Sequence, residues 1–324
     1  MLEMPDVYYL SQWGKLNEVL ENGIYEEFFF QSSLGKIVYP YIKRPTPIKV
    51  DGVQYFDIIT PYGFNGPCII ECSGNKEDLL TGYTNAFNNY CKEKNIIAEY
   101  VRFSPWLNNA QDFSNNYELC DNNMTLFIDL AKGDYFEKCF DSKCRNQIRK
   151  AQKIGVKIEF DFDGTMLDVF FELYEKMIEK NNVSNYYRFS KEFIKNTFER
   201  IKGNIFIAVA FFGDIPISAA MFMFYGDKVH YHLSGNDREY SSCCGNHLLL
   251  SSVADWSYNN GYKTLHLGGI SKDNVGLYNF KKGFAKDGEL KFFVGKRIDN
   301  DKIYNKIVEQ SATENSSYFP QYRG

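Results

Sequence analysis

Hydrophobic and polar positions follow their most regular pattern in the second half of the chain. Residues 156–163, VKIEFDFD, alternate with a period of two and predict a strand. Residues 165–182 carry apolar side chains at helical spacing and predict a helix. A second helix is predicted over 190–203, with Ser190 as its N-cap and Gly203 at its end.

Three apolar runs come next, and two Gly-Asp pairs separate them. Gly-Asp between apolar runs is typical of hairpin turns, so the pattern predicts three consecutive antiparallel strands. The rest of this half predicts alternating helices and strands: a helix over 245–261, a strand over 262–269, a short helix over 273–284 and a last strand over 290–298.

The first half has a weaker pattern, because glycines and prolines interrupt several of its apolar runs. It still predicts a mixed α/β arrangement, which we interpret as a degenerate second copy of the same fold. The expected elements are one or two strands in 26–45, a partly looped segment at 53–70, a helix over 76–95, strands over 96–105 and 124–131, and a helix over 135–155.

A chain of 324 residues exceeds the size of one ordinary core and predicts two domains. We place the first domain at 1–154 and the second at 155–300. The C-terminal segment 301–324 is expected to return to the first domain. The fold class predicted is therefore α/β with a mixed sheet, built from two consecutive domains.

The charge balance argues against a globally basic nucleic-acid binder. The net charge is −4, so contact with nucleic acid would need a local basic patch, and no DNA partner is expected. No N-terminal stretch resembles a signal peptide, and no run of about 18 apolar residues would span a membrane. A cytoplasmic protein is expected, and peripheral contact with a membrane is left open.

The stretch YSSCCGNH raises the question of a metal site. Cys243 and Cys244 are adjacent and His247 follows, while His230 and His232 alternate on one predicted strand. Adjacent cysteines rarely chelate one ion well, because zinc ligands usually come as spaced pairs on turns. None of the eight cysteines forms a C-x-x-C pair, so reduced thiols and no bound metal are expected.

The order of predicted elements in the second half is strand, two helices, three strands, helix, strand, helix, strand. This order resembles the GNAT acyltransferase fold. The segment NVGLYNFKKGFA is similar to a sequence pattern of that family, although the match is shorter between Asn274 and Leu277. The residues that carry the similarity are Asn274, Leu277, Tyr278, Lys281, Gly283 and Phe284.

Two linked GNAT-like domains joined by a basic helix resemble the Fem family, the non-ribosomal peptidyltransferases of peptidoglycan cross-bridge synthesis. The resemblance covers most of the chain, although no long helical hairpin arm is recognisable in the second domain. It rests on GLYNFKKGF and on the stretch CRNQIRKAQKIGVKI, with Arg145, Ile148, Arg149, Lys150, Ala151, Lys153, Gly155 and Val156.

The resemblance implies an acyltransferase that forms an amide bond. It would move an aminoacyl group from aminoacyl-tRNA to an amine of a peptidoglycan precursor, without a further cofactor. The first domain would serve the acceptor and the second the donor. Two alternatives remain: an acyl-CoA-dependent N-acyltransferase of surface-polysaccharide or cell-envelope biosynthesis, and a non-catalytic module that kept the fold.

The turn before helix 245–261 bears on the choice of donor. CoA-using GNAT enzymes hold the pyrophosphate with a glycine-rich turn at a helix N-terminus. In this chain Tyr240, Cys243 and Gly245 take the corresponding positions, and only the last is a glycine. The turn thus resembles a phosphate loop that has lost its pattern, which favours a donor other than CoA.

Lys281 and Tyr278 are the candidate catalytic residues. Acyl transfer to an amine produces a tetrahedral oxyanion and a leaving group that needs a proton. In the GNAT resemblance Tyr278 takes the place of a general acid, and Lys281, one turn later, would stabilise the oxyanion. The structural alternatives are a packed tyrosine and a solvated lysine near a helix end.

Further candidates would bind substrate. Gly268 and Gly269 end a predicted strand and allow close approach to a substrate, or they simply form a turn. Ser234 and Asn236 follow the preceding strand and would border the donor pocket.

Basic residues form two further candidate sites. Arg145, Arg149 and Lys153 recur every four residues and share one helix face, which would contact phosphates or be a solvated face. Lys43 and Arg44 precede Pro45. In the Fem resemblance a lysine near this point helps to hold the diphosphate of the acceptor.

Overall fold

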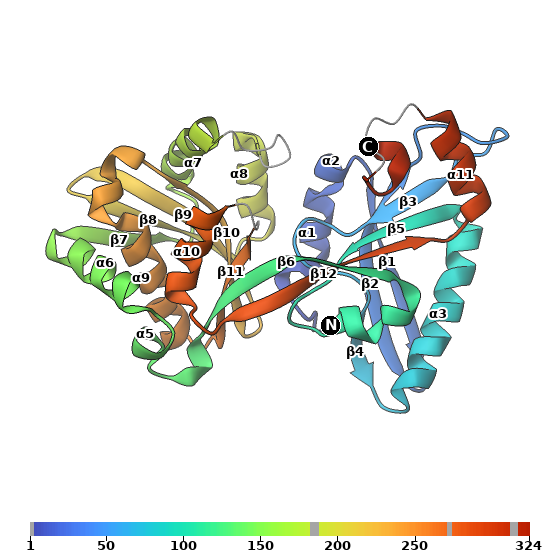
Figure 1. Cartoon of the computed structure of the whole chain (residues 1–324), viewed down its shortest axis with the longest axis horizontal. Helices are drawn as coiled ribbons and strands as arrows, with labels where there is room; N and C mark the ends of the chain where they lie inside the picture. Colours follow the sequence, from blue (N-terminus) through green and yellow to red (C-terminus); the bar gives the residue numbers. More distant parts are fainter. Residues whose placement is uncertain (1–2, 182–187, 271–273, 312–316) are drawn as a thin grey trace. The chain divides into compact units, whose positions relative to one another are not determined.

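The protein, described here by a computed structural model, forms two compact units (Figure 1). Unit 1 comprises Met1–Asn122 and Lys291–Gly324, and unit 2 comprises Asn123–Leu290. The structure describes residues 3–181, 188–270, 274–311 and 317–324. Each unit is considered by itself.

The division into units differs from the predicted boundary at 154/155. Helix α6 (Ser142–Lys153) belongs to unit 2, because Cys144, Ile148 and Ala151 lie in the core of that unit. The last strand, β12 (Glu289–Ile298), was assigned to the second domain from its sequence, but from Lys291 onward it belongs to unit 1, where Val294–Ile298 pair with β5. The apolar pattern predicts that a strand exists but not which sheet it joins.

Unit 2 contains a mixed sheet with the strand order β6-β11-β10-β9-β8-β7. The predicted run of three antiparallel strands is confirmed, with β9 between β8 and β10. The bounds are β6 Glu118–Asp129, β7 Val156–Asp161, β8 Ile205–Phe212, β9 Ile215–Tyr225, β10 Lys228–Asn236 and β11 Thr264–Ile270.

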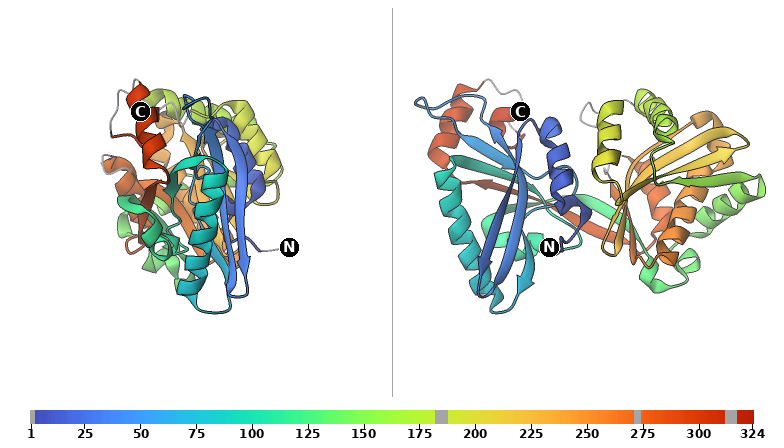
Figure 2. Two further views of the ribbon diagram at one scale, coloured as in Figure 1. Left: turned by 90° about the vertical axis from the view of Figure 1, so that its right-hand side faces the viewer. Right: turned by 180° about the vertical axis from the view of Figure 1, so that it is seen from behind.

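Helices cover both faces of this sheet. Figures 1 and 2 show α6 and α9 on one face and α7 and α8 on the other. Ser190 caps α8 as predicted, because its hydroxyl accepts a hydrogen bond from the Phe193 N–H at 3.1 Å. The helices are α5 Tyr135–Lys138, α6, α7 Leu167–Asn181, α8 Lys191–Arg200, α9 Gly245–Asn259 and α10 Val275–Phe284, with 3₁₀ turns at Leu130–Lys132 and Arg238–Cys243.

Strands β10 and β11 are parallel neighbours whose ladder is short. It pairs Lys228–His230 with Thr264–His266. Beyond this point β10 shifts its register against β9 between Tyr231 and Leu233, and β11 shifts against β6 between His266 and Gly268. Bulges of this kind redirect side chains and often lie beside functional sites.

Unit 1 repeats the same scheme. Its strands follow the order β1-β2-β3-β5-β12, with β4 beside β2, and β3 and β5 are again parallel neighbours. In the sequence, α9 lies between the parallel strands β10 and β11. In the same way, α3 lies between the parallel strands β3 and β5. The bounds are β1 Ile24–Ser32, β2 Gly35–Pro45, β3 Phe56–Ile59, β4 Cys68–Cys72, β5 Ile96–Arg102 and α3 Lys76–Glu93.

Shorter helices complete unit 1. On β1, Phe28 packs against rings of α3, whereas Tyr25 lies directly over Gly14 of α1. The C-terminal segment belongs to unit 1, where Tyr304 of α11 packs with Ile97 of β5. The bounds are α1 Ser11–Leu16, α2 Glu18–Glu21, α4 Asn109–Asp112 and α11 Asp301–Gln310, with 3₁₀ turns at Val7–Tyr9, Ser114–Asn116 and Gln321–Arg323.

Candidate active site in unit 2

Lys281 is a buried lysine on the second turn of α10. Asn274 begins this helix by accepting a hydrogen bond from the Leu277 N–H at 3.0 Å, and the helix then directs Lys281 toward the end of β11. The side chain is only 6% exposed, and Nζ donates a hydrogen bond to the carbonyl oxygen of Gly269 at 2.9 Å. The solvated lysine considered from the sequence is therefore excluded.

Burial lowers the pKa of Lys281 from 10.5 to about 8. The cause is desolvation, because the ammonium form loses its hydration when the side chain is enclosed. An amine that titrates near neutral pH can hold or release a proton during a reaction. Strongly perturbed groups of this kind concentrate at functional sites.

Gly268 keeps open the space beside the Lys281 amine. Its φ of +79° lies in the left-handed region, and a Cβ built on it would come within 3.6 Å of Nζ and 3.7 Å of the Tyr231 carbonyl oxygen. A larger residue would thus be strained and would occupy this space. A Cβ on the exposed Gly269 would meet no atom within 4 Å. The two predicted glycines and Lys281 therefore come together at the end of β11.

Two buried histidines lie next to this group on β10 and β11. The Nδ1 atoms of His230 and His266 are 3.1 Å apart, and one ring holds the shared proton. Burial, His230 and the Lys281 charge keep the pKa of His266 well below its usual range, so its imidazole is neutral. Sequence reasoning treated His230 as a member of a strand pair and did not single out His266. The available signal was the repeat of HLSG, which begins at His232, as HLGG, which begins at His266, although the structure pairs His266 with His230 instead.

Tyr278 points to a different partner from Lys281. Its hydroxyl donates a hydrogen bond to Glu289 Oε1 at 3.0 Å, and Lys282 pairs with the same carboxylate. This hydrogen bond to Glu289 raises the pKa of Tyr278, which makes its phenol a weaker acid. The structure therefore does not bring Tyr278 and Lys281 to one point, as the shared helix face had suggested.

Ser234 and Asn236 are half-buried on β10 beyond its bulge. The intervening Gly235 faces α7 so closely that a Cβ there would lie 2.3 Å from the backbone of Leu173 and Tyr174. Helix α7 therefore packs directly on the strand segment that carries the two predicted residues. This placement leaves their proposed contact with a donor a prediction.

The turn before α9 is organised by packing. A Cβ on Gly245 would lie 2.8 Å from the Ile217 side chain, so this glycine lets α9 approach β9. The only remaining glycine of the suspected phosphate loop thus has a structural explanation. The backbone of Cys244 is in the left-handed region, with a φ of 57°. Cys243 and Cys244 are both free thiols, and each is 8% exposed. His247 packs on Phe280, with ring centroids 5.1 Å apart.

The basic face of α6 is only partly available to a ligand. Arg145 donates to the carbonyl oxygen of Phe140 at 2.6 Å and pairs with Glu137 at 3.3 Å, so it holds α6 against α5. Arg149 pairs with Glu137 at 3.5 Å but stays more than half exposed, and Lys153 is exposed. A phosphate contact therefore remains a prediction for Arg149 and Lys153, while Arg145 has a structural role.

The predicted diphosphate residues of the first domain are both paired with acids. Lys43 forms an ion pair with Glu26. Arg44 is 5% exposed and its guanidinium lies 2.6 Å from Asp57 and 3.8 Å from Glu21. Asp57 also holds the C-terminal tail through Arg323 at 2.7 Å. Arg44 is therefore part of a buried charge network that explains it without a substrate.

Metal-ligating side chains do not gather at Cys243 and Cys244 in the part of the chain that the structure describes. The one group of three that it contains lies in unit 1 and includes Cys91. Among the described residues, no helix combines the length and the apolar character needed to cross a bilayer.

Comparison with known proteins supports the predicted resemblance. Residues 140–282 match the family model of the acetyltransferase (GNAT) domain. A curated relative is the UDP-N-acetylmuramoylpentapeptide-lysine N(6)-alanyltransferase of Weissella viridescens, 23% identical over 193 residues. The match covers 57% of this chain and 56% of the relative, so the chain matches just over half of that protein's length.

Solved structures confirm the fold. The crystal structure of FemX superposes with a TM-score of 0.70 at 15% identity, over 94% of this chain and 95% of FemX. The C-terminal domain of a putative lysylphosphatidylglycerol synthetase from Agrobacterium fabrum gives 0.55 at 15% identity, covering 89% and 88%. L-PGS from Bacillus licheniformis gives 0.54 at 14% identity, covering 94% and 96%. The Fem resemblance and the predicted fold class, two successive GNAT-like domains, are thereby confirmed.

Proposed function

From a GNAT acetyltransferase domain at residues 140–282, in a chain with the fold of FemX, we propose that the protein is an N-acyltransferase that forms an amide bond. The proposed acceptor is an amine of a peptidoglycan precursor. The support is the similarity to an alanyltransferase whose name specifies N6 of a lysine in UDP-N-acetylmuramoylpentapeptide. The proposed donor is an aminoacyl-tRNA, as the Fem resemblance implies, and we place the reaction in the cytoplasm, where that donor occurs.

The reaction balances without a further cofactor. The neutral acceptor amine attacks the ester carbonyl carbon of the donor, so that a C–N bond forms and the carbonyl oxygen becomes an oxyanion. When the tetrahedral intermediate collapses, the C–O bond to the ribose breaks. The proton lost by the amine is matched by one gained by the ribose oxygen.

The observation that carries the proposal is the buried amine of Lys281 beside Gly268. We assign the Lys281 ammonium to the oxyanion, because preorganised charge in a water-poor site stabilises a developing anion strongly. The missing side chain of Gly268 leaves room for the carbonyl oxygen close to Nζ. A non-catalytic module would gain nothing from a buried ammonium, which destabilises the fold.

An acyl-CoA donor is the second candidate, because the matched family model is an acetyltransferase domain. The turn before α9 speaks against it. Gly245 packs on Ile217, and Cys243 carries a side chain at the position where CoA-using enzymes have a glycine whose backbone approaches the pyrophosphate. We therefore rank the aminoacyl-tRNA donor first.

Mass spectrometry of the acceptor distinguishes the two donors. The purified chain is incubated with a UDP-linked muramoyl pentapeptide and either tRNA charged with all amino acids or acetyl-CoA. We expect the acceptor to gain the mass of one aminoacyl residue with charged tRNA and to stay unchanged with acetyl-CoA. Acetylation of the acceptor would support the second candidate, and an unchanged acceptor in both reactions would contradict both.

A further inference from the structure

A group of buried acceptor atoms in unit 1 lies apart from the candidate active site. Cys91 comes from α3, Glu99 from β5 and Asp299 from the residue after β12. The Cys91 sulfur and one carboxylate oxygen from each acid all lie within 4.8 Å of one another. The three residues come from distant parts of the sequence, which is why no sequence motif announces them.

Burial and missing donors make this group unusual. Glu99 is 0% exposed and the Asp299 side chain 6% exposed. Tyr117 and Tyr39 donate to Glu99 Oε2 at 2.8 and 3.2 Å. Among the described residues, no other side chain or backbone N–H donates a hydrogen bond to Glu99 Oε1 or Asp299 Oδ2, and the two carboxyl groups are close enough to hydrogen-bond each other when one is protonated. Buried carboxylate oxygens without another donor are costly, and they indicate a bound cation or a shared proton.

Arg297 supplies part of the positive charge but not all of it. Its guanidinium lies 2.8 Å from Asp299 Oδ1 and 3.4 Å from Glu99 Oε1, and it also contacts Asn88. Burial raises the pKa of Glu99 and that of Cys91, so both groups hold protons when no ion is bound. Once deprotonated on a cation, the two carboxylates and the thiolate would carry three negative charges, of which Arg297 balances one. A divalent cation would balance the other two.

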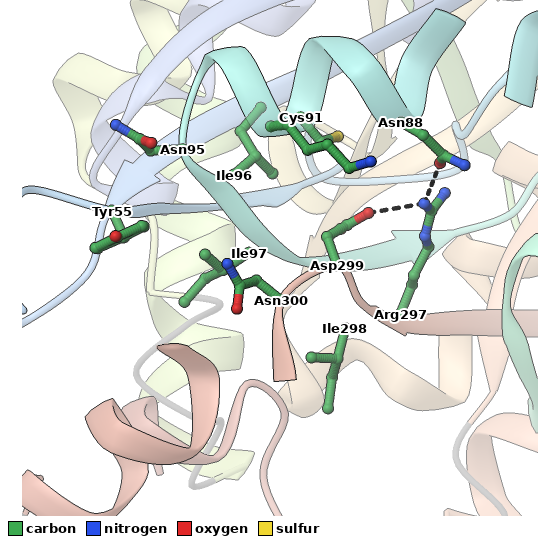
Figure 3. A pocket seen from close by; sticks show the side chains of 11 residues that line it. Tyr55, Asn88, Cys91, Asn95, Ile96, Ile97, Arg297, Ile298, Asp299 and Asn300 are labelled. Carbon is green, nitrogen blue, oxygen red and sulfur yellow. Dashed lines mark hydrogen bonds and ion pairs between the residues drawn. The ribbon is translucent and has the colours of Figure 1, made fainter. Parts of the chain in front are cut away.

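A cavity reaches this group from solvent. It has a volume of about 210 Å³, and its wall includes Cys91, Asp299 and Arg297 (Figure 3), whereas Glu99 is not among the residues that line it. An ion therefore has a path of entry, and water can fill a fourth coordination position. Three protein ligands with one open position are an arrangement that zinc accepts.

We propose that Cys91, Glu99 and Asp299 bind one divalent cation of the zinc class in unit 1. One thiolate and two carboxylates suit zinc and cobalt better than magnesium or calcium, which prefer oxygen ligands alone. Zinc–sulfur and zinc–oxygen bonds of roughly 2.3 and 2.1 Å require the ligands to close in by about an ångström. The ion ties α3 and β5 to the chain segment that follows β12. The proposal is independent of the function proposed for unit 2.

Cobalt substitution tests the site through the sulfur ligand. The full chain is treated with a chelator and titrated with Co²⁺. We expect one equivalent to bind with a thiolate-to-cobalt charge-transfer absorption, and Zn²⁺ to displace it. Cys91→Ser should remove this absorption. Cys68→Ser is the matched control, because Cys68 is also buried in unit 1 but lies outside the group, and it should keep the absorption.

The opposite outcomes overturn the proposal. In one, the wild-type chain shows no thiolate-to-cobalt absorption when Co²⁺ is added. In the other, the Cys91→Ser variant keeps this absorption. In either case a proton shared between Glu99 and Asp299 would account for the group. Should Cys91→Ser fail to fold, an anomalous-scattering map of cobalt-soaked wild-type crystals decides. A peak between the Cys91 sulfur and the two carboxylates supports the site, and its absence refutes it.

Discussion

Replacing Lys281 by methionine should make unit 2 more stable while it removes activity. The folded pKa of Lys281 is about 8 and the ordinary value is 10.5. At 1.36 kcal/mol per pKa unit, the buried charge destabilises the fold by roughly 3 kcal/mol at neutral pH. Methionine has a similar length and no charge. Losing the hydrogen bond to Gly269 costs about 1 kcal/mol, so a net gain of roughly 2 kcal/mol is expected.

The sign of the pH dependence follows from the lowered pKa. Below pH 8 the folded and the unfolded chain both hold the Lys281 proton, and the full penalty applies. Between pH 8 and 10.5 the unfolded chain binds more protons than the folded one, so wild-type stability rises with pH. The advantage of Lys281→Met should therefore shrink by roughly 3 kcal/mol across this window.

Urea unfolding of three chains measures this difference. Wild type, Lys281→Met and Lys286→Met are compared between pH 7 and pH 10.5. Lys286 is the matched control, because it lies in the same region but is exposed. All three chains share unit 1, so the differences between them report unit 2. A variant that is less stable than wild type at pH 7, or a difference that does not change with pH, would refute the reasoning.

Three further predictions concern other residues. Gly268→Ala should lower the transfer rate at least tenfold, because its methyl group occupies the space beside Lys281 Nζ, whereas Gly269→Ala should change the rate little; equal rates in the two variants would contradict this. Arg149→Ala and Lys153→Ala should weaken tRNA binding in a filter assay and make its salt dependence shallower, and an unchanged salt slope would count against the phosphate contact. Asp57→Asn should destabilise unit 1 by about 3 kcal/mol or more in thermal unfolding, because it leaves Arg44 buried without its main partner; an unchanged melting temperature would be incompatible with the network.

The elements of unit 2 could be predicted from sequence because local signals agreed there. Ser190 caps α8 and Gly-Asp turns separate β8, β9 and β10, as the pattern indicated. The pairing of strands that lie far apart in the sequence has no such local signal. Strand β12 follows α10 directly in the sequence, yet its residues Val294–Ile298 pair with Arg102–Ala98 of β5 in unit 1. The predicted domain boundary was displaced for this reason.

The helix predicted over 135–155 is two helices. The helix is interrupted at Cys139–Asp141. Asp141 is the N-cap of α6, and its side chain accepts a hydrogen bond from the Cys144 N–H at 2.6 Å. Aspartate at this position is an ordinary N-cap. The signal was present in the sequence, but the continuous basic and apolar pattern on both sides concealed it.

Candidate site residues were predictable by kind but not by environment. Lys281 and Gly268 were identified, and the structure places the amine beside the glycine. The sequence also made Arg44 and Arg145 candidates for substrate binding. Their acidic and carbonyl partners come from Asp57 and Phe140, and only the folded backbone brings these groups together. Helical spacing states which residues share a face and not what covers that face.

The rate of amide bond formation in wild type and Lys281→Met tests the central claim most directly. Both chains are supplied with saturating charged tRNA and muramoyl pentapeptide, and the labelled amino acid transferred to the acceptor is counted over time. The account predicts a kcat lower by a factor of about 100 or more in the variant, with KM for both substrates nearly unchanged. A folded Lys281→Met variant that transfers the amino acid at the wild-type rate would contradict it.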